Sequence, residues 1–331
     1  MIFSQQFAEG RIIREPMGFA NGHWAGAPGY FFEPVEEAHY LTYRIRRPRG
    51  VAPDRGGEAR IARSGDGENF EDIWSVTKDQ YGSASIERSA IRKAPDGRWR
   101  YFTSYVDAKD GRWCVDQIAA SSVERLNPAN RRRIFSASAL GLEGIKDPWI
   151  LETREGFQMF LSVAIRTPRT SGSSHDTLDI FNTGDCLSAT GLAFSHDLDE
   201  WAWQGVVFAP TGNGWDGYCR RINSVVPLGE KFLGFYDGSA SARENYEEKT
   251  ALVVSNDLRA WQSLSPGGPF VTSPHASGSI RYIDAQMVGD RVFIFYEFAR
   301  ADGAHDLRLI QTDPGELAGA MAGRDESAGK S

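Results

Sequence analysis

One polar turn, Ser195-His-Asp-Leu-Asp-Glu-Trp201, decides the fold of this chain because versions of it recur along the sequence. A second full copy is Ser255-Asn-Asp-Leu-Arg-Ala-Trp261, and more divergent copies begin at residues 64, 121 and 311. The copies lie somewhat further apart than the roughly 40 to 50 residues of known propeller repeats, each of which forms a four-stranded blade. Five copies predict an all-β fold, a five-bladed β-propeller with four-stranded antiparallel blades around a central funnel.

Between the turns lie short aromatic alternations, such as Trp99-Arg-Tyr-Phe-Thr-Ser-Tyr105 and Val292-Phe-Ile-Phe-Tyr296. Segments that are rich in aromatic and β-branched residues and bounded by Gly or Asp are typical of strands. Ser and Asp side chains stabilise tight turns by bonding to their own backbone. We therefore interpret the serine turns as structural and place no chemistry in them.

The chain of 331 residues is interpreted as one domain, since each repeat of such a fold is stabilised by its neighbours. Residues 1–316 form the predicted propeller domain. Within it, the segment 7–14 lies outside the repeat and should supply the outer strand of the last blade, which would remove an exposed edge. Residues 317–331 are small and polar, and we expect them to form a disordered tail.

The charge, the cysteines and the opening residues restrict the functional class. The net charge is −7, from 37 basic and 44 acidic residues, whereas nucleic-acid binders usually carry a basic surplus. The three cysteines are widely spaced and odd in number, which argues against a disulfide framework or a zinc site. The chain has no apolar run of membrane-spanning length, and its opening residues lack the pattern of a signal peptide. We expect a cytoplasmic protein without a nucleic-acid partner, a membrane partner, a metal or a cofactor.

The starts of the inner strands are the candidate functional positions. In a propeller the innermost strand of each blade begins at the funnel, and concave sites of this kind are where ligands usually bind. In this sequence each expected inner strand has polar or charged residues ahead of its apolar part. We expect the following residues to face a shared pocket: His23, Trp24, Glu87, Arg88, Lys146, Asp147, Arg220, Arg221, Arg281 and Tyr282.

Strand direction adds residues to the same face. The second strands should end at the funnel mouth, so Asp237 and Glu297, which end two of them, join the candidate pocket. The loops that follow should form its rim. The longest of these loops, 166–186, holds His175, and long loops in compact domains are usually functional or disordered. We expect this loop to narrow the funnel and His175 to bind substrate.

The two full serine turns, together with Lys146-Asp147-Pro148-Trp149 at the start of the third inner strand, resemble those of five-bladed propeller glycosidases. These are the arabinanase, xylosidase and invertase-like families and the related glycoside phosphorylases. They use an Asp of blade one as base or nucleophile, the Asp of blade three to tune a partner or hold sugar hydroxyls, and a Glu as acid. The resemblance carries over Asp147. It differs at Ala25-Gly-Ala-Pro28, where those enzymes place the first Asp, and at Arg220-Arg221, where arabinanase-like members place the Glu.

The resemblance implies a glycoside hydrolase, and sugar hydrolysis requires two carboxyl groups. Asp147 and Glu87 are the leading pair. Asp147 lies beside Lys146 and should stay ionised, whereas Glu87 serves as the general acid if burial outweighs the effect of Arg88 on its pKa. Glu297, which has aromatic neighbours, is the reserve acid. The structural alternatives are an ion pair for Glu87 and a strand-initiating cap for Asp147.

Basic residues stand at four of the five expected inner-strand starts of this acidic chain. Arginine binds carboxylates and phosphates bidentately, so the funnel favours a short anionic oligosaccharide or glycoside of uronic type. The alternative is that several of these arginines bridge neighbouring blades through carboxylates such as Glu87 and Asp284. Three functions other than hydrolysis stay open: a glycoside phosphorylase, a uronic polysaccharide lyase, and a noncatalytic carbohydrate-binding propeller.

Overall fold

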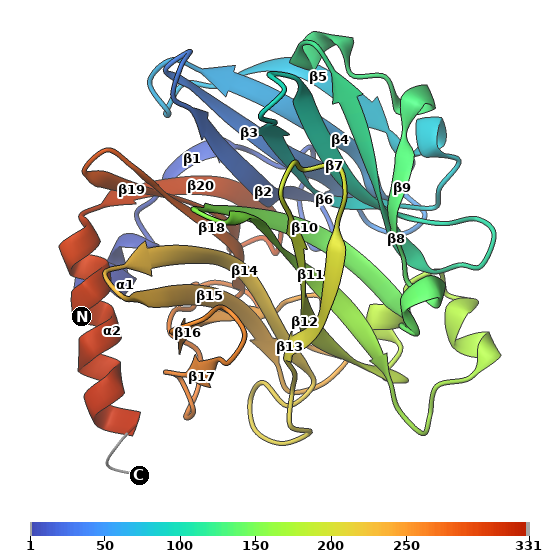
Figure 1. The fold of residues 1–331 in the computed structure, drawn as a ribbon. Helices are drawn as coiled ribbons and strands as arrows, with labels where there is room; N and C mark the ends of the chain where they lie inside the picture. Colours follow the sequence, from blue (N-terminus) through green and yellow to red (C-terminus); the bar gives the residue numbers. More distant parts are fainter. Residues whose placement is uncertain (1, 329–331) are drawn as a thin grey trace.

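The structure is a computed structural model that describes residues 2–328, and most of the chain lies in antiparallel strands (Figure 1). The mostly β fold that the repeat predicts is therefore confirmed. Antiparallel pairing within residues 2–328 joins the strands in five groups of four. Single parallel bridges link four of these groups into one 16-stranded sheet, and the remaining group forms a separate four-stranded sheet.

The strands of each group are as follows. The first group contains β2 (Trp24–Glu33), β3 (Ala38–Arg47), β4 (Arg55–Ser64) and β5 (Glu71–Thr77). The second contains β6 (Ile86–Lys93), β7 (Trp99–Val106), β8 (Trp113–Ala120) and β9 (Arg132–Ser136). The third contains β10 (Gly144–Thr153), β11 (Gly156–Arg166), β12 (Cys186–Ser195) and β13 (Ala202–Phe208). The fourth contains β14 (Cys219–Leu228), β15 (Lys231–Ser239), β16 (Lys249–Ser255) and β17 (Gln262–Ser263). The fifth contains β18 (Ile280–Val288), β19 (Arg291–Ala299), β20 (His305–Thr312) and β1 (Arg11–Arg14).

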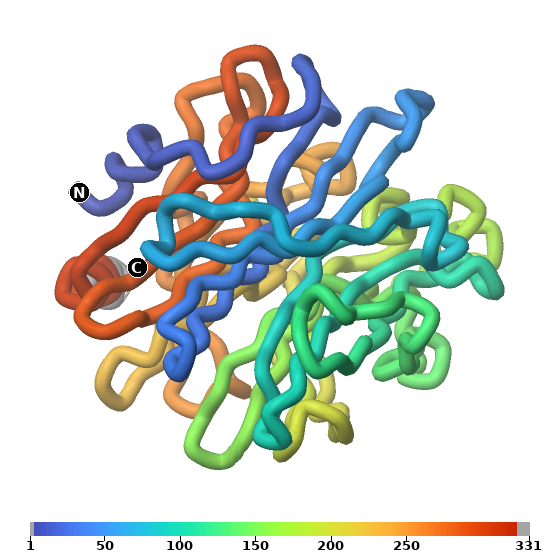
Figure 2. Tube along the Cα trace, turned by 90° about the horizontal axis from the view of Figure 1, so that it is seen from above, coloured from blue at the N-terminus to red at the C-terminus, as the bar shows by residue number. Residues whose placement is uncertain are grey.

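The fifth group is built from both ends of the chain. Strand β1 pairs antiparallel with β20, as predicted for the segment 7–14. In Figure 2 the blue N-terminal segment accordingly lies beside the red C-terminal strands. This pairing covers an edge of β20 that would otherwise be open to association with other chains.

The first strands of the five groups lie together at the centre of the molecule (Figure 1): each of β2, β6, β10 and β14 contacts the next, and β18 contacts β2. One buried ion pair touches all five of them. Arg88 on β6 donates to the carbonyls of Pro28 (2.7 Å) and Asn223 (2.8 Å) and to the carboxylate of Asp284 (3.0 Å). Asp284 in turn accepts a hydrogen bond from the indole of Trp149 (2.9 Å). We call Arg88–Asp284 the axial pair.

The serine turns are structural, as predicted. Ser195 Oγ accepts hydrogen bonds from the backbone N–H groups of Asp197 (3.3 Å) and Leu198 (2.9 Å). Asp197 Oδ1 accepts from the next two N–H groups, at 2.8 and 2.9 Å. The Trp201 ring then packs edge-on against Phe102 of the second group, with ring centroids 5.8 Å apart. The turn at Ser255 is built in the same way, and its Trp261 packs edge-on against Phe160 of the third group. These two turns thus satisfy their own backbone and supply an aromatic ring to the contact between groups.

The expectation of a disordered tail from residue 317 is wrong for the residues that the structure describes. Helix α2 (Pro314–Ala328) follows β20, and Leu317 within it is fully buried in one apolar cluster with Phe7. Glu316 accepts hydrogen bonds from Thr312 Oγ1 (2.6 Å) and Gln6 Nε2 (3.0 Å), which fastens the helix start. The predicted tail was assigned from composition, which does not show that Leu317 has an apolar site to enter. Residues 329–331 lie outside the described residues.

The remaining helical segments are short. Helix α1 (Ile2–Gln6) packs beside α2. The 3-10 turns are η1 (Lys78–Tyr81), η2 (Val123–Arg125), η3 (Pro128–Asn130), η4 (Ser138–Leu140), η5 (Gly172–His175) and η6 (Ile180–Asn182). Turns η5 and η6 divide the long loop 166–186, which therefore has local structure of its own.

Candidate active site

Every inner strand carries an irregularity near its first residues. The pairing register shifts between Gly26 and Gly29, Ile86 and Ser89, Lys146 and Trp149, Ile222 and Ser224, and Arg281 and Asp284. Three residues in these stretches have left-handed backbone: Ala27 (φ 51°), Asp147 (φ 56°) and Tyr282 (φ 53°). Bulges turn side chains away from the regular alternation and occur often beside active sites, where strained backbone also gathers. We call these five stretches the bulged layer.

Side chains of the neighbouring group hold the left-handed residues in place. In each case the acceptor comes from the second strand of the preceding group. The backbone N–H of Ala27 donates to the Glu297 carboxylate (3.1 Å), that of Asp147 to the Ser104 hydroxyl (2.9 Å), and that of Tyr282 to the Asp237 carboxylate (3.1 Å). Asp237 and Glu297 are fully buried. The structure therefore places these two predicted pocket residues behind the bulged layer, where they fix its backbone.

A pocket lies at this end of the inner strands. Its lining comes from the inner-strand starts, the ends of the second strands and three of the predicted rim loops. The lining residues are Trp24, Arg44, Arg46, Arg55, Glu87, Lys146, Asp179, Asn182, Arg221, Asn245, Tyr246, Glu248, Arg281 and Tyr282. The set contains six cations and three carboxylates, and two further carboxylates behind the lining, Glu297 and Asp147, pair with three of the cations. The free volume of about 20 Å³ is that of roughly one water molecule.

Glu297 is the centre of an ion network under the pocket. Its Oε1 accepts hydrogen bonds from Arg281 Nε (2.8 Å) and lies 2.8 Å from His305 Nδ1, and its Oε2 accepts from Arg44 Nη2 (3.2 Å). Burial opposes the charged form, but the positive charge of Arg281 and the contact with His305 prevail and lower the pKa of Glu297. A buried carboxylate that is held ionised in this way cannot donate a proton. The geometry therefore argues against Glu297 as the reserve acid.

Glu248 extends the network to the fourth group. Its two oxygens pair with Arg221 and with Arg281 Nη1, the latter at 2.6 Å, and the Glu248 side chain is 1% exposed. Arg221 and Arg281 therefore line the pocket as predicted, but each is already neutralised by a protein carboxylate. A substrate anion would compete with Glu248 for them.

Glu87 keeps one carboxylate oxygen free. Its Oε2 pairs with Arg44, whereas Oε1 has no hydrogen-bond partner among residues 2–328, and the side chain is 11% exposed. The ion pair that the sequence suggested as an alternative does exist, but its partner is not the adjacent Arg88. Arg88 is bonded at the axis instead, whereas Glu87 lines the pocket. Glu87 thus presents an unbonded oxygen at the pocket.

Asp147 lies in the bulged layer next to the pocket-lining Lys146, whose Nζ is 3.5 Å from Asp147 Oδ2. By geometry neither carboxylate oxygen accepts a hydrogen bond within the described chain, although the residue is 3% exposed. Burial tends to raise its pKa, but the charges of Lys146 and Arg221, with a contribution from the Ser162 hydroxyl, outweigh burial and lower the pKa of Asp147. The prediction that Lys146 keeps this carboxyl ionised agrees with the geometry.

Tyr282 lines the pocket between these acidic groups. Its pKa is raised well above the ordinary tyrosine value by burial and by the negative charges of Asp147 and Glu87. The phenol therefore stays protonated at neutral pH and is available as a hydrogen-bond donor. Tyr282 thus lines the pocket, and its role in substrate binding stays a prediction.

Two of the arginines that are predicted to line the pocket, Arg88 and Arg220, lie outside its lining. Arg88 belongs to the axial pair, so the alternative interpretation, a bridge through Asp284, is the correct one for this residue. Arg220 donates to both oxygens of Asp216, at 2.8 and 3.0 Å. Because it precedes Arg221 on a strand, it points to the opposite face. The sequence pattern predicts that both doublets, Glu87-Arg88 and Arg220-Arg221, lie at the funnel. It does not show which member of each doublet lines the pocket.

The two predicted histidines also lie elsewhere. His175 Nε2 is 2.8 Å from Glu143 Oε2, and Glu143 also pairs with Arg112 (2.9 Å) and Arg166 (2.8 Å), so His175 anchors the long loop. His23 packs over Gly18, where an added Cβ would lie 2.4 Å from the ring. Both histidines therefore serve local structure and do not line the pocket.

Trp24 lines the pocket as predicted, but its ring is not free for a sugar. It stacks on His305 with ring centroids 4.8 Å apart and carries the guanidinium groups of Arg46 (4.1 Å) and Arg281 (4.4 Å). Its role in the described structure is to support cations of the pocket rather than to stack on substrate.

Several pocket residues were missed by sequence reasoning. These are Arg44, Arg46, Arg55, Asp179, Asn182, Asn245, Tyr246 and Glu248. A signal existed for the first two, since Arg44 and Arg46 alternate at the end of the second strand of the first group, the same end that marked Asp237 and Glu297. The others lie at or beyond strand ends, where the alternation of a strand gives no guide to direction.

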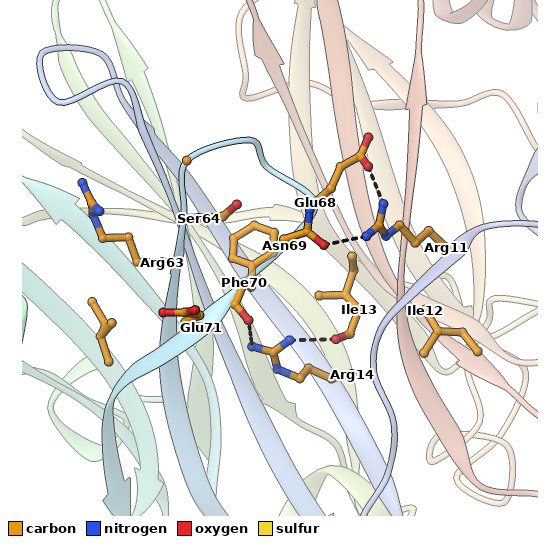
Figure 3. A pocket seen from close by; sticks show the side chains of 12 residues that line it. Arg11, Ile12, Ile13, Arg14, Arg63, Ser64, Glu68, Asn69, Phe70 and Glu71 are labelled. Atoms are coloured by element: carbon orange, nitrogen blue, oxygen red, sulfur yellow. Dashed lines mark hydrogen bonds and ion pairs between the residues drawn. The ribbon is translucent and has the colours of Figure 1, made fainter.

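A larger groove lies away from this site, between β1 and the turn after β4 (Figure 3). Its volume is about 490 Å³. Two of its arginines are bonded within it: Arg11 contacts Glu68 and Asn69, and Arg14 donates to the carbonyl of Phe70 at 2.8 Å. The groove is thus an open junction between the first and last groups.

Two classes of feature are missing from the described part of the chain. Among residues 2–328, no cluster of three or more His, Cys, Asp or Glu side chains is placed to hold a metal ion. In the same residues, no helix combines the length and the apolar character that crossing a membrane would require.

Comparison with known proteins identifies the fold. No protein-family model and no curated protein sequence matches the chain. Among solved structures, a thermostable family-43 glycoside hydrolase has a TM-score of 0.63 at 12% identity, covering 89% of this chain and 92% of its own. The β-1,2-mannobiose phosphorylase of Listeria innocua has a TM-score of 0.60 at 13% identity, covering 94% of each chain. The endo-arabinase of Bacteroides thetaiotaomicron has a TM-score of 0.56 at 12% identity, covering 89% of this chain and 97% of its own. The chain therefore shares the fold of the propeller glycosidases and phosphorylases that its motifs resemble.

Proposed function

We propose that the five strand groups are the blades of a five-bladed propeller and that the chain is an enzyme that cleaves a glycosidic bond at the central pocket. The observation that carries the proposal is the placement of Glu87, whose free oxygen faces a charged pocket beside the bulged layer. Concave pockets with convergent ionisable groups are the usual sites of catalysis. The glycoside hydrolases that share the fold support the same assignment.

Glu87 is the proposed general acid. Its Oε2 is bonded to Arg44, and its Oε1 is free to contact the glycosidic oxygen of a bound sugar, the position from which a general acid acts. Asp147 is the proposed second carboxylate. It stays ionised at neutral pH, and its negative charge favours the positive charge that develops on the sugar ring in the transition state.

The substrate is proposed to be a short oligosaccharide or glycoside with a negatively charged, uronic-type sugar. The support is the excess of cations over carboxylates in the pocket lining. Arginine recognises a carboxylate with paired hydrogen bonds, which a neutral sugar does not offer. Because the free volume holds about one water molecule, lining side chains must move when a sugar enters.

Hydrolysis is the first candidate reaction and phosphorolysis is the second. A cationic pocket suits inorganic phosphate as the attacking group as well as a sugar carboxylate. The Listeria innocua structure with a similar fold is a phosphorylase. The two reactions differ in the product, which is a free sugar after hydrolysis and a sugar 1-phosphate after phosphorolysis.

The test is a panel of neutral and uronic glycosides, assayed with and without inorganic phosphate, for the parent protein and Glu87→Gln. We expect the parent to cleave at least one uronic substrate and the variant to lose about 100-fold or more in kcat, which is the usual contribution of a general acid. Glu68→Gln, at an exposed ion pair, is the matched control.

Circular dichroism and the thermal midpoint must show that the Glu87 variant is folded. Full turnover by Glu87→Gln would contradict its assigned role. A panel without any cleavage would favour the noncatalytic binding propeller, and an unsaturated, ultraviolet-absorbing product would identify a lyase.

A further inference from the structure

Arg46 is a pocket cation without an anionic partner. Its one hydrogen bond within residues 2–328 is from Nη1 to the carbonyl of Gly22, at the long distance of 3.5 Å, and no carboxylate lies within ion-pair distance. The residue is nevertheless 7% exposed. By contrast, Arg44 and Arg281 of the same pocket are each bonded to two carboxylates. The fold therefore leaves the charge of Arg46 unneutralised.

Aromatic rings hold this guanidinium in position. Its central carbon lies 4.1 Å from the centroid of the Trp24 ring and 5.3 Å from that of Tyr246. Contacts of this kind attract a cation but leave its N–H groups free. The N–H groups of Arg46 are thus fixed at the pocket and available to a ligand.

The surroundings make the charged form of Arg46 costly. Burial lowers its pKa to about 10, and the like charge of Arg44 adds to this effect. A buried cation without an anionic partner destabilises a folded protein, and the contacts with the Trp24 and Tyr246 rings offset only part of that cost. A ligand anion would remove the cost by supplying the missing charge and hydrogen bonds.

We propose that Arg46 is the specificity-determining residue of the pocket and that it binds the carboxylate of a uronic sugar. The inference rests on the proposed function and assigns one part of it to one residue. A guanidinium held by ring faces keeps a fixed plane, which suits paired hydrogen bonds to a carboxylate. Inorganic phosphate has the same oxyanion chemistry, so the experiment must separate the two sources.

The experiment measures binding without turnover. Isothermal titration calorimetry measures the affinity of four proteins: the parent, Arg46→Met, Arg46→Lys and Arg220→Met. The ligands are D-glucuronate, D-galacturonate, a galacturonate trimer, D-glucose and inorganic phosphate. Arg220 is the matched control because it is an arginine of the neighbouring face that is bonded to Asp216 outside the pocket. Thermal midpoints confirm that each variant is folded.

We expect at least one uronic ligand to bind the parent and Arg220→Met alike, with glucose at least tenfold weaker. Arg46→Met should weaken the uronic ligand about tenfold or more. Arg46→Lys should fall between the two, since it keeps the charge but not the planar fork. Equal uronate binding by the parent and Arg46→Met would overturn the inference. It would also be overturned if no uronic ligand bound, or if phosphate alone bound in an Arg46-dependent way.

The same variants separate this inference from the proposed enzyme. On a cleaved uronic substrate, Arg46→Met should raise KM with a smaller change in kcat, the signature of lost binding rather than lost chemistry. If uronate binding depends on Arg46 but no glycoside is turned over, the role of Arg46 is confirmed and the proposed enzymatic activity is contradicted. Cleavage of neutral glycosides that is unaffected by Arg46→Met would uphold the enzyme and remove the inference.

Discussion

Two buried arginines, Arg88 at the axis and Arg46 at the pocket, are treated by the fold in opposite ways. Arg88 donates three hydrogen bonds of 2.7 to 3.0 Å, one of them to the carboxylate of Asp284, and its side chain is fully buried. Arg46 makes one long hydrogen bond of 3.5 Å and has no carboxylate partner within the described residues. Residue type and burial are nearly the same, so the difference lies in the partners.

The comparison separates structural from ligand-binding cations. A buried arginine whose three nitrogens each donate to a carbonyl or a carboxylate stabilises the arrangement of those groups, and its removal leaves them unpaired. A buried arginine whose N–H groups are free costs stability and has to be explained by something that binds it. The axial pair belongs to the first class and Arg46 to the second.

The largest expected effect is the loss of stability on removing the axial arginine, and it tests the comparison between Arg88 and Arg46. Arg88→Met should lower the free energy of unfolding by about 3–5 kcal/mol, because Asp284 is left buried without its cation. Urea unfolding at pH 7 measures this, with Arg63→Met at the surface as the control. A loss below about 1 kcal/mol would mean that the axial pair does not hold the inner strands together.

Removing a charge from the ion network around Glu297 should destabilise the fold, as removing a charge from the axial pair does. Glu297→Gln should cost about 3 kcal/mol at neutral pH, because Arg44 and Arg281 lose a shared partner. The lowered pKa of Glu297 fixes the pH dependence. Its stabilising effect is complete above the ordinary carboxyl value of about 4.3 and is lost as the pH falls through the lower pKa of the folded state.

The parent and Glu297→Gln should therefore converge in stability as the solution is acidified. Urea unfolding at pH 7 and at pH 3 or below checks this. A gap between the two proteins that stays constant over that range would show that the charge of Glu297 does not stabilise the fold.

Much of this could be predicted from the sequence, and the limits have physical causes. The recurring turn at Ser195 and Ser255 predicted the strand groups because such turns satisfy their backbone locally, whatever surrounds them. The starts of the inner strands predicted six of the fourteen residues that line the pocket. Which member of a charged doublet lines the pocket depends on the phase of the strand and its bulge, and for this reason the sequence does not separate Glu87 from Arg88 or Arg221 from Arg220. Arg46 stands at the end of a second strand, and the strand-end argument that predicts Asp237 and Glu297 applies to it as well.

The loop over the pocket should show a smaller effect. Tyr246 donates a hydrogen bond of 2.6 Å to Asp179 on the loop 166–186, and its ring also supports Arg46. Tyr246→Phe keeps the ring but removes the hydroxyl, at a cost of about 1–2 kcal/mol to loop closure. Hydrogen exchange of the loop amides should become faster while uronate affinity stays within about twofold. Unchanged exchange would show that this hydrogen bond does not hold the loop.

The smallest effect is expected at Arg220. Its pair with Asp216 is partly exposed, with the arginine side chain 17% exposed, and pairs of this kind contribute about 1 kcal/mol or less. Arg220→Met should therefore fold normally and bind uronate like the parent. A loss of uronate binding as large as that of Arg46→Met would show that Arg220 contacts the ligand. It would contradict the assignment of Arg220 and Arg221 to opposite faces of β14.

The unfolding free energy of Arg46→Met tests the central claim most directly. If the fold leaves this cation unpaired for a ligand, removing it should cost nothing or stabilise the ligand-free protein by up to about 1 kcal/mol at pH 7, since an unpaired buried charge is lost and an apolar side chain remains. A loss of about 3 kcal/mol or more, like that expected for Arg88→Met, would show that Arg46 is a structural residue with partners of its own.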